Sequence, residues 1–145
     1  MAANQRPVFS LLPINPIVNL SVANTSNAVV ASPADATDFR LLYTCAKTDG
    51  AKVGTIGYQW IGTGTPAAGI LNIWITDTSG ANARVRRMYA FAIAAGAIST
   101  TVQGSYVELS FLDFQVSNGQ KIFVSVTTVA ANTTLNVFAS IGEFN

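Results

Sequence analysis

The amino-acid sequence predicts a single all-β domain: an antiparallel β-sandwich, jelly roll or small barrel of about eight strands. Its 145 residues match the usual size of one domain. Apolar and polar residues alternate with a period of two along several short segments, as expected for strands with one buried face. Turn residues separate these segments, and among them Asp49-Gly50 and Asn118-Gly119 accept the positive φ angles of tight hairpins.

Residues 1–16 form the first element, which we predict to be an extended N-terminal arm ahead of a strand domain at 17–145. The arm contains three prolines: Pro7, Pro13 and Pro16. Each proline fixes φ and removes a backbone donor, so the arm cannot be a helix or a central strand. It also carries four large apolar side chains: Val8, Phe9, Leu11 and Leu12. Because exposure of such side chains is unfavourable, we expect them to contact a neighbouring subunit, with an edge strand of the same domain as the alternative.

Eight segments of the domain have strand character. In chain order they are residues 17–23, 38–47, 52–61, 70–77, 84–93, 106–116, 121–129 and 134–144. In the last segment, for example, Leu135, Val137 and Ile141 share one face, and Asn136 and Ser140 lie on the other. This alternation predicts one face of each strand in a core and one face turned away from it.

The segment at residues 84–95 has two interpretations. It contains Ala, Met and Arg, which are good helix formers and could make a short helix. We prefer a strand, which places four large side chains on one face: Val85, Tyr89, Phe91 and Ile93. The segment also holds the basic cluster of the chain: Arg84, Arg86 and Arg87. Guanidinium groups form bidentate pairs with carboxylates, so we expect these arginines to contact a protein partner, with a solvated strand face as the alternative.

The composition points to a surface that is covered by other subunits. Charged residues make up 10% of the chain, against about 25% in an average soluble domain. Hydrophobic residues reach 50% and the mean hydropathy is +0.38. The net charge of +1 provides no field to attract nucleic acid. The apolar run at 90–98 is far short of the roughly 20 residues that span a bilayer, so we expect neither a nucleic-acid nor a membrane partner.

The sequence also lacks the side chains on which most catalytic and metal sites depend. It contains no histidine, which removes the commonest general base and metal ligand, and Cys45 is its single cysteine. Ser–His and Cys–His nucleophiles and Cys/His zinc sites are therefore excluded within this chain. Cys45 alternates with Leu41 and Tyr43, which predicts a core position. We expect no enzymatic activity, no catalytic residues, no cofactor and no bound metal.

Both ends of the chain resemble the small head decoration, or cement, proteins of tailed phages. The N-terminal segment Pro7-Val8-Phe9-Ser10-Leu11-Leu12-Pro13 is similar to the proline-flanked apolar segment of that group. The C-terminal segment Ile141-Gly142-Glu143-Phe144 is similar to its Gly–acidic–aromatic terminus. The resemblance implies a sandwich or barrel that binds the major capsid protein on the outer surface of the head, often as a trimer. It implies a virion location, after assembly in the host cytoplasm, and no catalytic residues.

Three alternatives stay open from the sequence. The first is a tail or fibre component, which is also a virion protein that acts through subunit contacts. The second is a carbohydrate-binding jelly roll, because four aromatic residues could offer stacking faces: Tyr58, Trp60, Trp74 and Tyr89. The third is an outer-membrane barrel, which is disfavoured because the N-terminus has no signal-peptide pattern and the consistent strand faces resemble a packed core.

Overall fold

The computed structural model describes residues 10–25, 34–76, 85–96, 98–99, 102–109 and 114–144. Within these ranges the chain forms ten β-strands and no helix, which confirms the predicted all-β class. The strands are β1 (Ser10–Ile14), β2 (Ile17–Leu20), β3 (Arg40–Thr44), β4 (Ala51–Gly62), β5 (Gly69–Thr76), β6 (Val85–Ile93), β7 (Val107–Leu109), β8 (Phe114–Val116), β9 (Lys121–Val126) and β10 (Thr133–Phe144).

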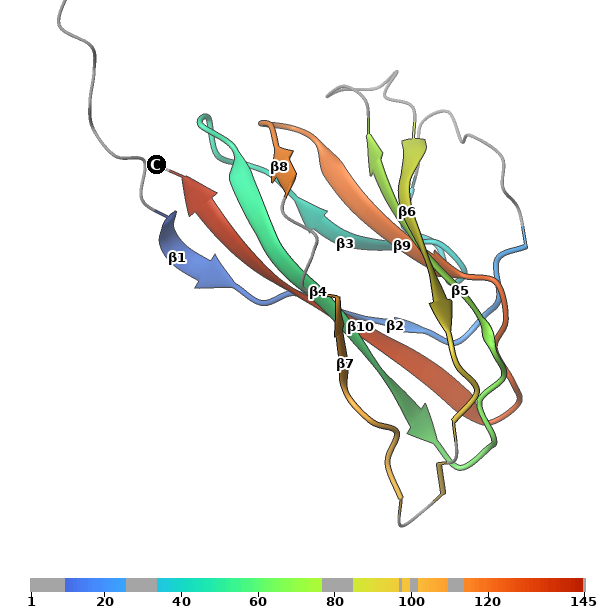
Figure 1. Ribbon diagram of the computed structural model, residues 1–145. Helices are drawn as coiled ribbons and strands as arrows, with labels where there is room; N and C mark the ends of the chain where they lie inside the picture. The colour runs from blue at the N-terminus through green and yellow to red at the C-terminus, as the bar shows by residue number, and fades with distance from the viewer. Residues whose placement is uncertain are drawn as a thin grey trace, which may run out of the picture.

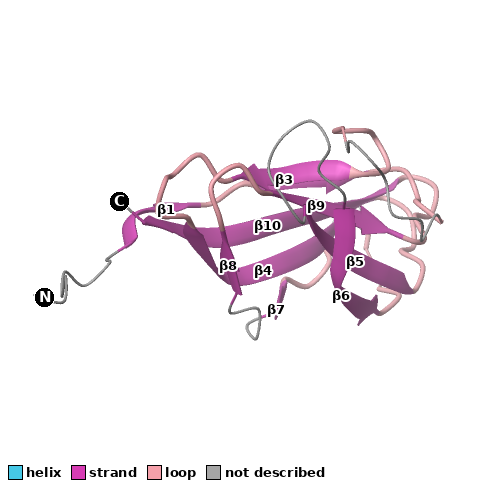
Figure 2. Ribbon diagram, turned by 90° about the horizontal axis from the view of Figure 1, so that it is seen from above, coloured by secondary structure: helices cyan, strands magenta, loops and turns pink. Residues whose placement is uncertain are grey.

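The strands make two antiparallel sheets that pack face to face (Figures 1 and 2). Sheet I has the order β1-β10-β4-β7, in which β2 also pairs with β10 and β8 also pairs with β4. Sheet II has the order β3-β9-β5-β6. The predicted β-sandwich is therefore confirmed, and the barrel alternative is wrong because the described strands form two separate sheets.

The ten described strands occupy eight positions. β1 and β2 lie end to end along β10, because Ser10 pairs with Phe144 and Leu20 pairs with Leu135. β7 and β8 likewise share the other side of β4. In chain order the eight positions are β1/β2, β3, β4, β5, β6, β7/β8, β9 and β10. With this numbering, sheet I has the order 1-8-3-6 and sheet II has the order 2-7-4-5. This interleaving of first and last strands is the arrangement of a jelly roll.

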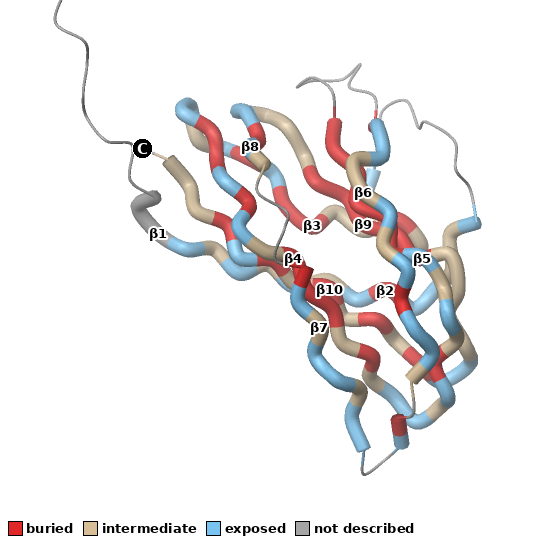
Figure 3. Tube along the Cα trace, in the orientation of Figure 1, coloured by how far each residue is buried: buried red, intermediate tan, exposed pale blue. Residues whose placement is uncertain are grey.

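The main core lies between the two sheets (Figure 3). On β10 the side chains of Leu135, Val137 and Ile141 are fully buried, as the alternation predicts. From sheet II they meet the buried side chains of β5 and β9, such as Ile73 and Val124. Each fully buried side chain of this size stabilises the fold by about 1.5–3 kcal/mol relative to exposure.

A β-bulge in β6 corrects one prediction from the sequence. Ile73 pairs with Tyr89 and Trp74 pairs with Arg87, so Met88 is an extra residue without a partner in β5. One inserted residue moves the following side chains to the opposite face. Tyr89 therefore packs against the main core, whereas Val85 belongs to a second cluster, and the predicted common face is wrong.

The second cluster covers the side of sheet II that faces away from the main core. Its buried members are Phe39, Trp74, Val85 and Phe123. Phe39 stacks on Phe123 with ring centroids 4.9 Å apart. The indole Nε1 of Trp74 donates a hydrogen bond of 2.9 Å to Ser125 Oγ, which is also buried. The second cluster thus buries part of the outer face of sheet II, around Trp74 of β5 and Phe123 of β9.

The second half of the predicted arm lies in sheet I. Residues 10–14 form β1, which pairs with the end of β10 in the same chain. This is the edge-strand alternative, and Pro13 is compatible with it because an edge strand leaves one side without ladder hydrogen bonds. Sheet I therefore includes residues 10–14, which the sequence analysis assigned to the arm. Residues 1–9 lie outside the described residues.

Candidate functional site

The outer face of sheet I carries a partly exposed aromatic pair. The ring of Tyr106, in the segment before β7, stacks on Phe138 of β10 with centroids 4.7 Å apart and planes 10° apart. Beneath this pair lies Gly57 of β4, where a Cβ atom would collide with the Phe138 ring. The missing side chain of Gly57 therefore lets the Phe138 ring lie flat on the sheet. Tyr106 is 55% exposed, and Ile17, opposite Phe138 on β2, is 65% exposed.

A row of amide side chains crosses the same face. Asn136 of β10 pairs in register with Asn19 of β2 on one side and with Gln59 of β4 on the other. Gln59 Nε2 donates a 2.9 Å hydrogen bond to the carbonyl oxygen of Gly104. Asn136 Oδ1 is buried and has no hydrogen-bond partner in the described structure. An unsatisfied buried acceptor of this kind costs about 1–3 kcal/mol.

We call this surface the contact face and define it by five residues: Ile17, Asn19, Tyr106, Asn136 and Phe138. In the described strands of sheet I the charged residues are Lys52, Glu108 and Glu143. None of these belongs to the contact face. Burial raises the pKa of Tyr106 above its ordinary value, and the neighbouring Glu108 charge raises it further. Its phenol is therefore neutral at physiological pH, and the five residues carry no charge, but the exposed Glu108 carboxylate lies beside them, at the strand position that pairs with Gly57.

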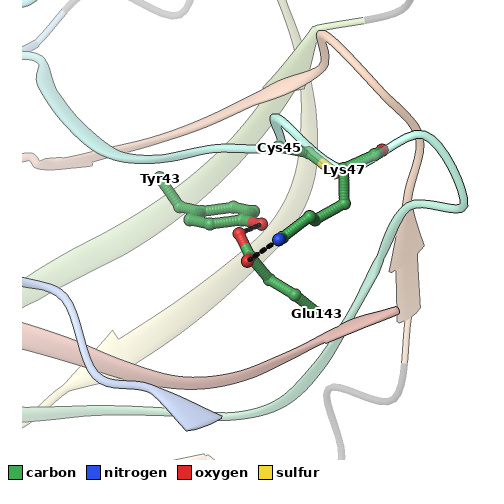
Figure 4. A network of polar contacts seen from close by, with 4 residues as sticks. All are labelled: Tyr43, Cys45, Lys47 and Glu143. Carbon is green, nitrogen blue, oxygen red and sulfur yellow. Dashed lines mark hydrogen bonds and ion pairs between the residues drawn. The ribbon is translucent and has the colours of Figure 1, made fainter. Parts of the chain in front are cut away.

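A polar network joins the two sheets near the C-terminal end of β10 (Figure 4). The Tyr43 hydroxyl, from β3, donates a 2.8 Å hydrogen bond to Oε1 of Glu143 on β10. Lys47 Nζ lies 3.9 Å from the other carboxylate oxygen, and Cys45 Sγ lies 3.8 Å from the Lys47 carbonyl oxygen. Burial raises the pKa of Tyr43 well above its ordinary value, and the hydrogen bond to Glu143 raises it further.

This network has a structural role. Glu143 belongs to the C-terminal segment that resembles the decoration proteins, and its side chain is only 13% exposed. The neutral Tyr43 hydroxyl donates to the carboxylate across the end of the sandwich. It therefore holds the end of β10, on which β1 pairs. Cys45 is 1% exposed and lies in the main core, as predicted.

Of the seven residues predicted to form a partner interface, the structure describes four, which lie on strands of two different sheets. Arg86 and Arg87 are exposed on β6, which is an edge of sheet II, and Arg87 Nη1 lies 3.5 Å from Asn72 Oδ1. Leu11 and Leu12 belong to β1 at an edge of sheet I, and nothing is described of their side chains. Val8, Phe9 and Arg84 lie outside the described residues. Their roles at an interface stay predictions.

Sequence reasoning missed the contact face. The alternation assigns Asn136 and Ser140 to the outer side of β10, and Phe138 lies between them on that same side. A large aromatic residue on an otherwise polar strand face was the signal that could have found it. Ile17 and Asn19 alternate with the partly buried Val18 in the same way on β2.

The four aromatics of the carbohydrate-binding alternative do not form an exposed stacking surface. Tyr58, Trp60 and Trp74 are between 3% and 7% exposed. Tyr89 packs against the main core and stacks on Phe91 with centroids 5.8 Å apart. Core packing accounts for these rings.

No group of three or more His, Cys, Asp or Glu side chains that could hold a metal occurs among the residues described. The same residues include no helix of the length and hydrophobicity needed to cross a membrane.

Comparisons with known proteins give weak likenesses to solved structures and nothing else. No family model and no curated protein matches the chain. A chain in the structure of the infectious bursal disease virus Gt strain is 12% identical, with a TM-score of 0.32. The match covers 91% of this chain and 33% of the viral chain, so this chain spans about a third of that chain's length. A likeness at this TM-score carries no argument about fold or function.

Proposed function

We propose that this chain is a structural virion protein: a capsid decoration or cement protein that binds the outer surface of a phage head and stabilises the shell through subunit contacts. The observation that carries the proposal is the contact face, an uncharged and partly exposed aromatic and amide surface on one sheet of an otherwise well-packed sandwich. Exposed apolar surface of this kind marks protein interfaces. The resemblance of both chain ends to decoration proteins supports the same function.

The size of sheet I suits a specific interface. β4 and β10 each have 12 residues, which corresponds to a length of about 40 Å. Four strand positions at about 4.8 Å give a width of about 19 Å. The resulting face of about 760 Å² is close to the ~800 Å² that each partner buries in a standard protein interface.

The proposed partners are the major capsid protein, or other virion subunits, and further copies of this chain in a trimer. The proposed location is the capsid surface, after assembly in the host cytoplasm. The proposal includes no enzymatic activity and no nucleic-acid or membrane partner. A tail or fibre component would use the same kind of contact, and the position of the chain in the particle distinguishes the two.

Two matched substitutions test the contact face. Ile17→Asp places a charge on it, at a side chain that is 65% exposed. Ile70→Asp is the control, because Ile70 is 41% exposed on β5 of the other sheet. Sedimentation equilibrium at micromolar concentration is expected to show a trimer for the wild type and for Ile70→Asp, and a shift to monomer for Ile17→Asp. A wild-type monomer would contradict the proposed trimer, and equal association of both variants would contradict a role of the contact face in it.

A further inference from the structure

A hollow of about 330 Å³ lies at the opposite end of the strands from the Tyr43–Glu143 network. Tyr58 and Trp60 of β4 form one side of it. The rest of the lining comes from segments 94–96 and 102–105 and from Val107. None of these described residues is charged. The hollow therefore suits a neutral and largely apolar occupant.

Trp60 gives the hollow a specific hydrogen-bonding requirement. The residue is 4% exposed, and its indole Nε1 has no hydrogen-bond partner in the described part of the chain. The other tryptophan behaves differently, because Trp74 Nε1 donates to Ser125 Oγ at 2.9 Å. Buried polar groups in folded proteins nearly always have a partner. An indole N–H is a donor only, so the missing partner must be an acceptor.

The wall of the hollow is held in place by backbone contacts. Gly104 N donates a 3.2 Å hydrogen bond to the Trp60 carbonyl oxygen, and Gln59 Nε2 donates to the Gly104 carbonyl oxygen. A Cβ at Gly104 would lie only 2.6 Å from the Trp60 carbonyl oxygen, so glycine permits this close approach. Gly104 is therefore held against β4, but Trp60 Nε1 is itself buried, so the indole or the wall of the hollow must shift before an acceptor can reach it.

An extended peptide that contains proline meets these requirements. Aromatic grooves bind such peptides because the proline ring is apolar and the extended backbone presents carbonyl acceptors. Proline brings no N–H, so it buries no donor that would lack a partner. A sugar would bring several hydroxyl groups, and each of them would need a polar partner in a lining that is mostly apolar.

We propose that this hollow binds the Pro7-Val8-Phe9 segment of a neighbouring copy of the chain, with a backbone carbonyl of the segment accepting the Trp60 N–H. The proposal deepens the proposed function, on which it rests, by naming one contact between subunits. It also gives a binding site to the N-terminal apolar side chains Val8 and Phe9.

Chain geometry favours a neighbour over the same molecule. Ser10 pairs with Phe144, whereas Trp60 pairs with Leu135, nine residues away along β10. That separation corresponds to about 30 Å. Pro7 lies three residues before Ser10 and can reach at most about 11 Å from it. The segment therefore cannot enter the hollow of its own chain.

Photo-cross-linking of the full-length chain tests this contact. Phe9→p-benzoylphenylalanine is introduced into unlabelled protein, which is mixed with an excess of ¹⁵N-labelled wild type at about 100 µM total, a concentration at which even weak contacts form. After irradiation, mass spectrometry is expected to find unlabelled–labelled cross-links to residues 94–107. Cross-links within one chain, cross-links to other segments, or none at all would overturn the proposal.

Variants of the labelled chain test the role of the indole. Trp60→Phe keeps an aromatic ring but removes the N–H, and should lower the cross-link yield about fivefold, as expected for one hydrogen bond. Trp74→Phe is the control and should leave the yield unchanged. Ala95→Leu is a second, independent variant that adds bulk to the hollow at an exposed lining position, and it should abolish the cross-link. It keeps the test valid if Trp60→Phe does not fold. Unchanged yields in both hollow variants would mean that a water molecule satisfies the indole, which overturns the proposal.

The outcome is separable from that of the proposed function. If the cross-link fails while Ile17→Asp still dissociates the oligomer, the hollow proposal is wrong and the contact face retains its support. If Ile17→Asp has no effect while the cross-link forms as expected, the contact face is wrong.

Discussion

Tyr43 and Glu143 have the most unusual environment of the ionisable side chains described here, and their role is structural. A buried phenol donates to a largely buried carboxylate, and Lys47 and Cys45 lie beside the pair. Hydrogen bonds to a charged acceptor are stronger than those between neutral groups. The pair therefore stabilises the end of the sandwich where the C-terminal segment lies.

Removal of the Tyr43 hydroxyl tests this role. Tyr43→Phe should lower the free energy of unfolding by about 1–3 kcal/mol, because it leaves the Glu143 carboxylate without its donor. Tyr106→Phe, which removes a hydroxyl from a side chain that is 55% exposed, is the control and should change stability by less than about 0.5 kcal/mol. Urea unfolding followed by tryptophan fluorescence measures both. Equal stability of the two variants would contradict the structural role.

The raised pKa of Tyr43 also predicts a pH dependence. Above about pH 10 the unfolded chain loses the phenol proton while the folded chain retains it, so the unfolded state binds fewer protons. The free energy of unfolding is therefore unaffected by this group below pH 10 and falls as pH rises beyond it. Tyr43→Phe should show a shallower alkaline decline than the wild type. The decline should not disappear, because burial also raises the pKa of Tyr58.

At the scale of the elements, the strands were predictable but their irregularities were not. Period-two alternation located the strands, because a strand with one buried face must alternate. The bulge at Met88 could not be predicted, since it depends on how β6 pairs with β5. The edge pairing of β1 was weighed only as an alternative, because prolines are equally compatible with an edge strand and with a free arm.

The candidate site was less predictable than the strands, for a related reason. Phe138 has the hydrophobicity of a core residue, although the alternation along β10 already places it on the outer side with Asn136 and Ser140, as the register confirms. The flat stacking with Tyr106 depends on Gly57 of a neighbouring strand, 81 residues earlier in the chain. A pattern within one segment contains no information about such a pairing.

Two glycines of β4 provide a test of this register. Gly57→Ala places a Cβ against the Phe138 ring and 2.9 Å from the Val107 carbonyl oxygen, so it should lower the free energy of unfolding by about 1–3 kcal/mol. Gly54→Ala meets only Ser140 O at 3.6 Å, an ordinary contact. That variant should be neutral or stabilising by up to about 1 kcal/mol. Thermal unfolding compares the two, and a destabilised Gly54→Ala beside an unaffected Gly57→Ala would contradict the described register.

At the scale of the whole molecule, the two sheets differ in what covers their outer faces. Part of the outer side of sheet II is buried beneath its own aromatic cluster, whereas sheet I leaves the contact face partly exposed. The low proportion of charged residues is explained if sheet I is covered by other subunits. The jelly roll then serves as a rigid frame that presents the contact face, with few charges around it, to a partner.

Electron microscopy of the native particle that contains this chain tests the central claim most directly. The expected result is density for the jelly roll on the outer surface of the capsid, with Ile17, Tyr106 and Phe138 buried against a capsid subunit or another copy of the chain. A position in the tail would support the tail or fibre alternative instead. Density in which the contact face is turned to solvent, with no subunit against it, would contradict the account.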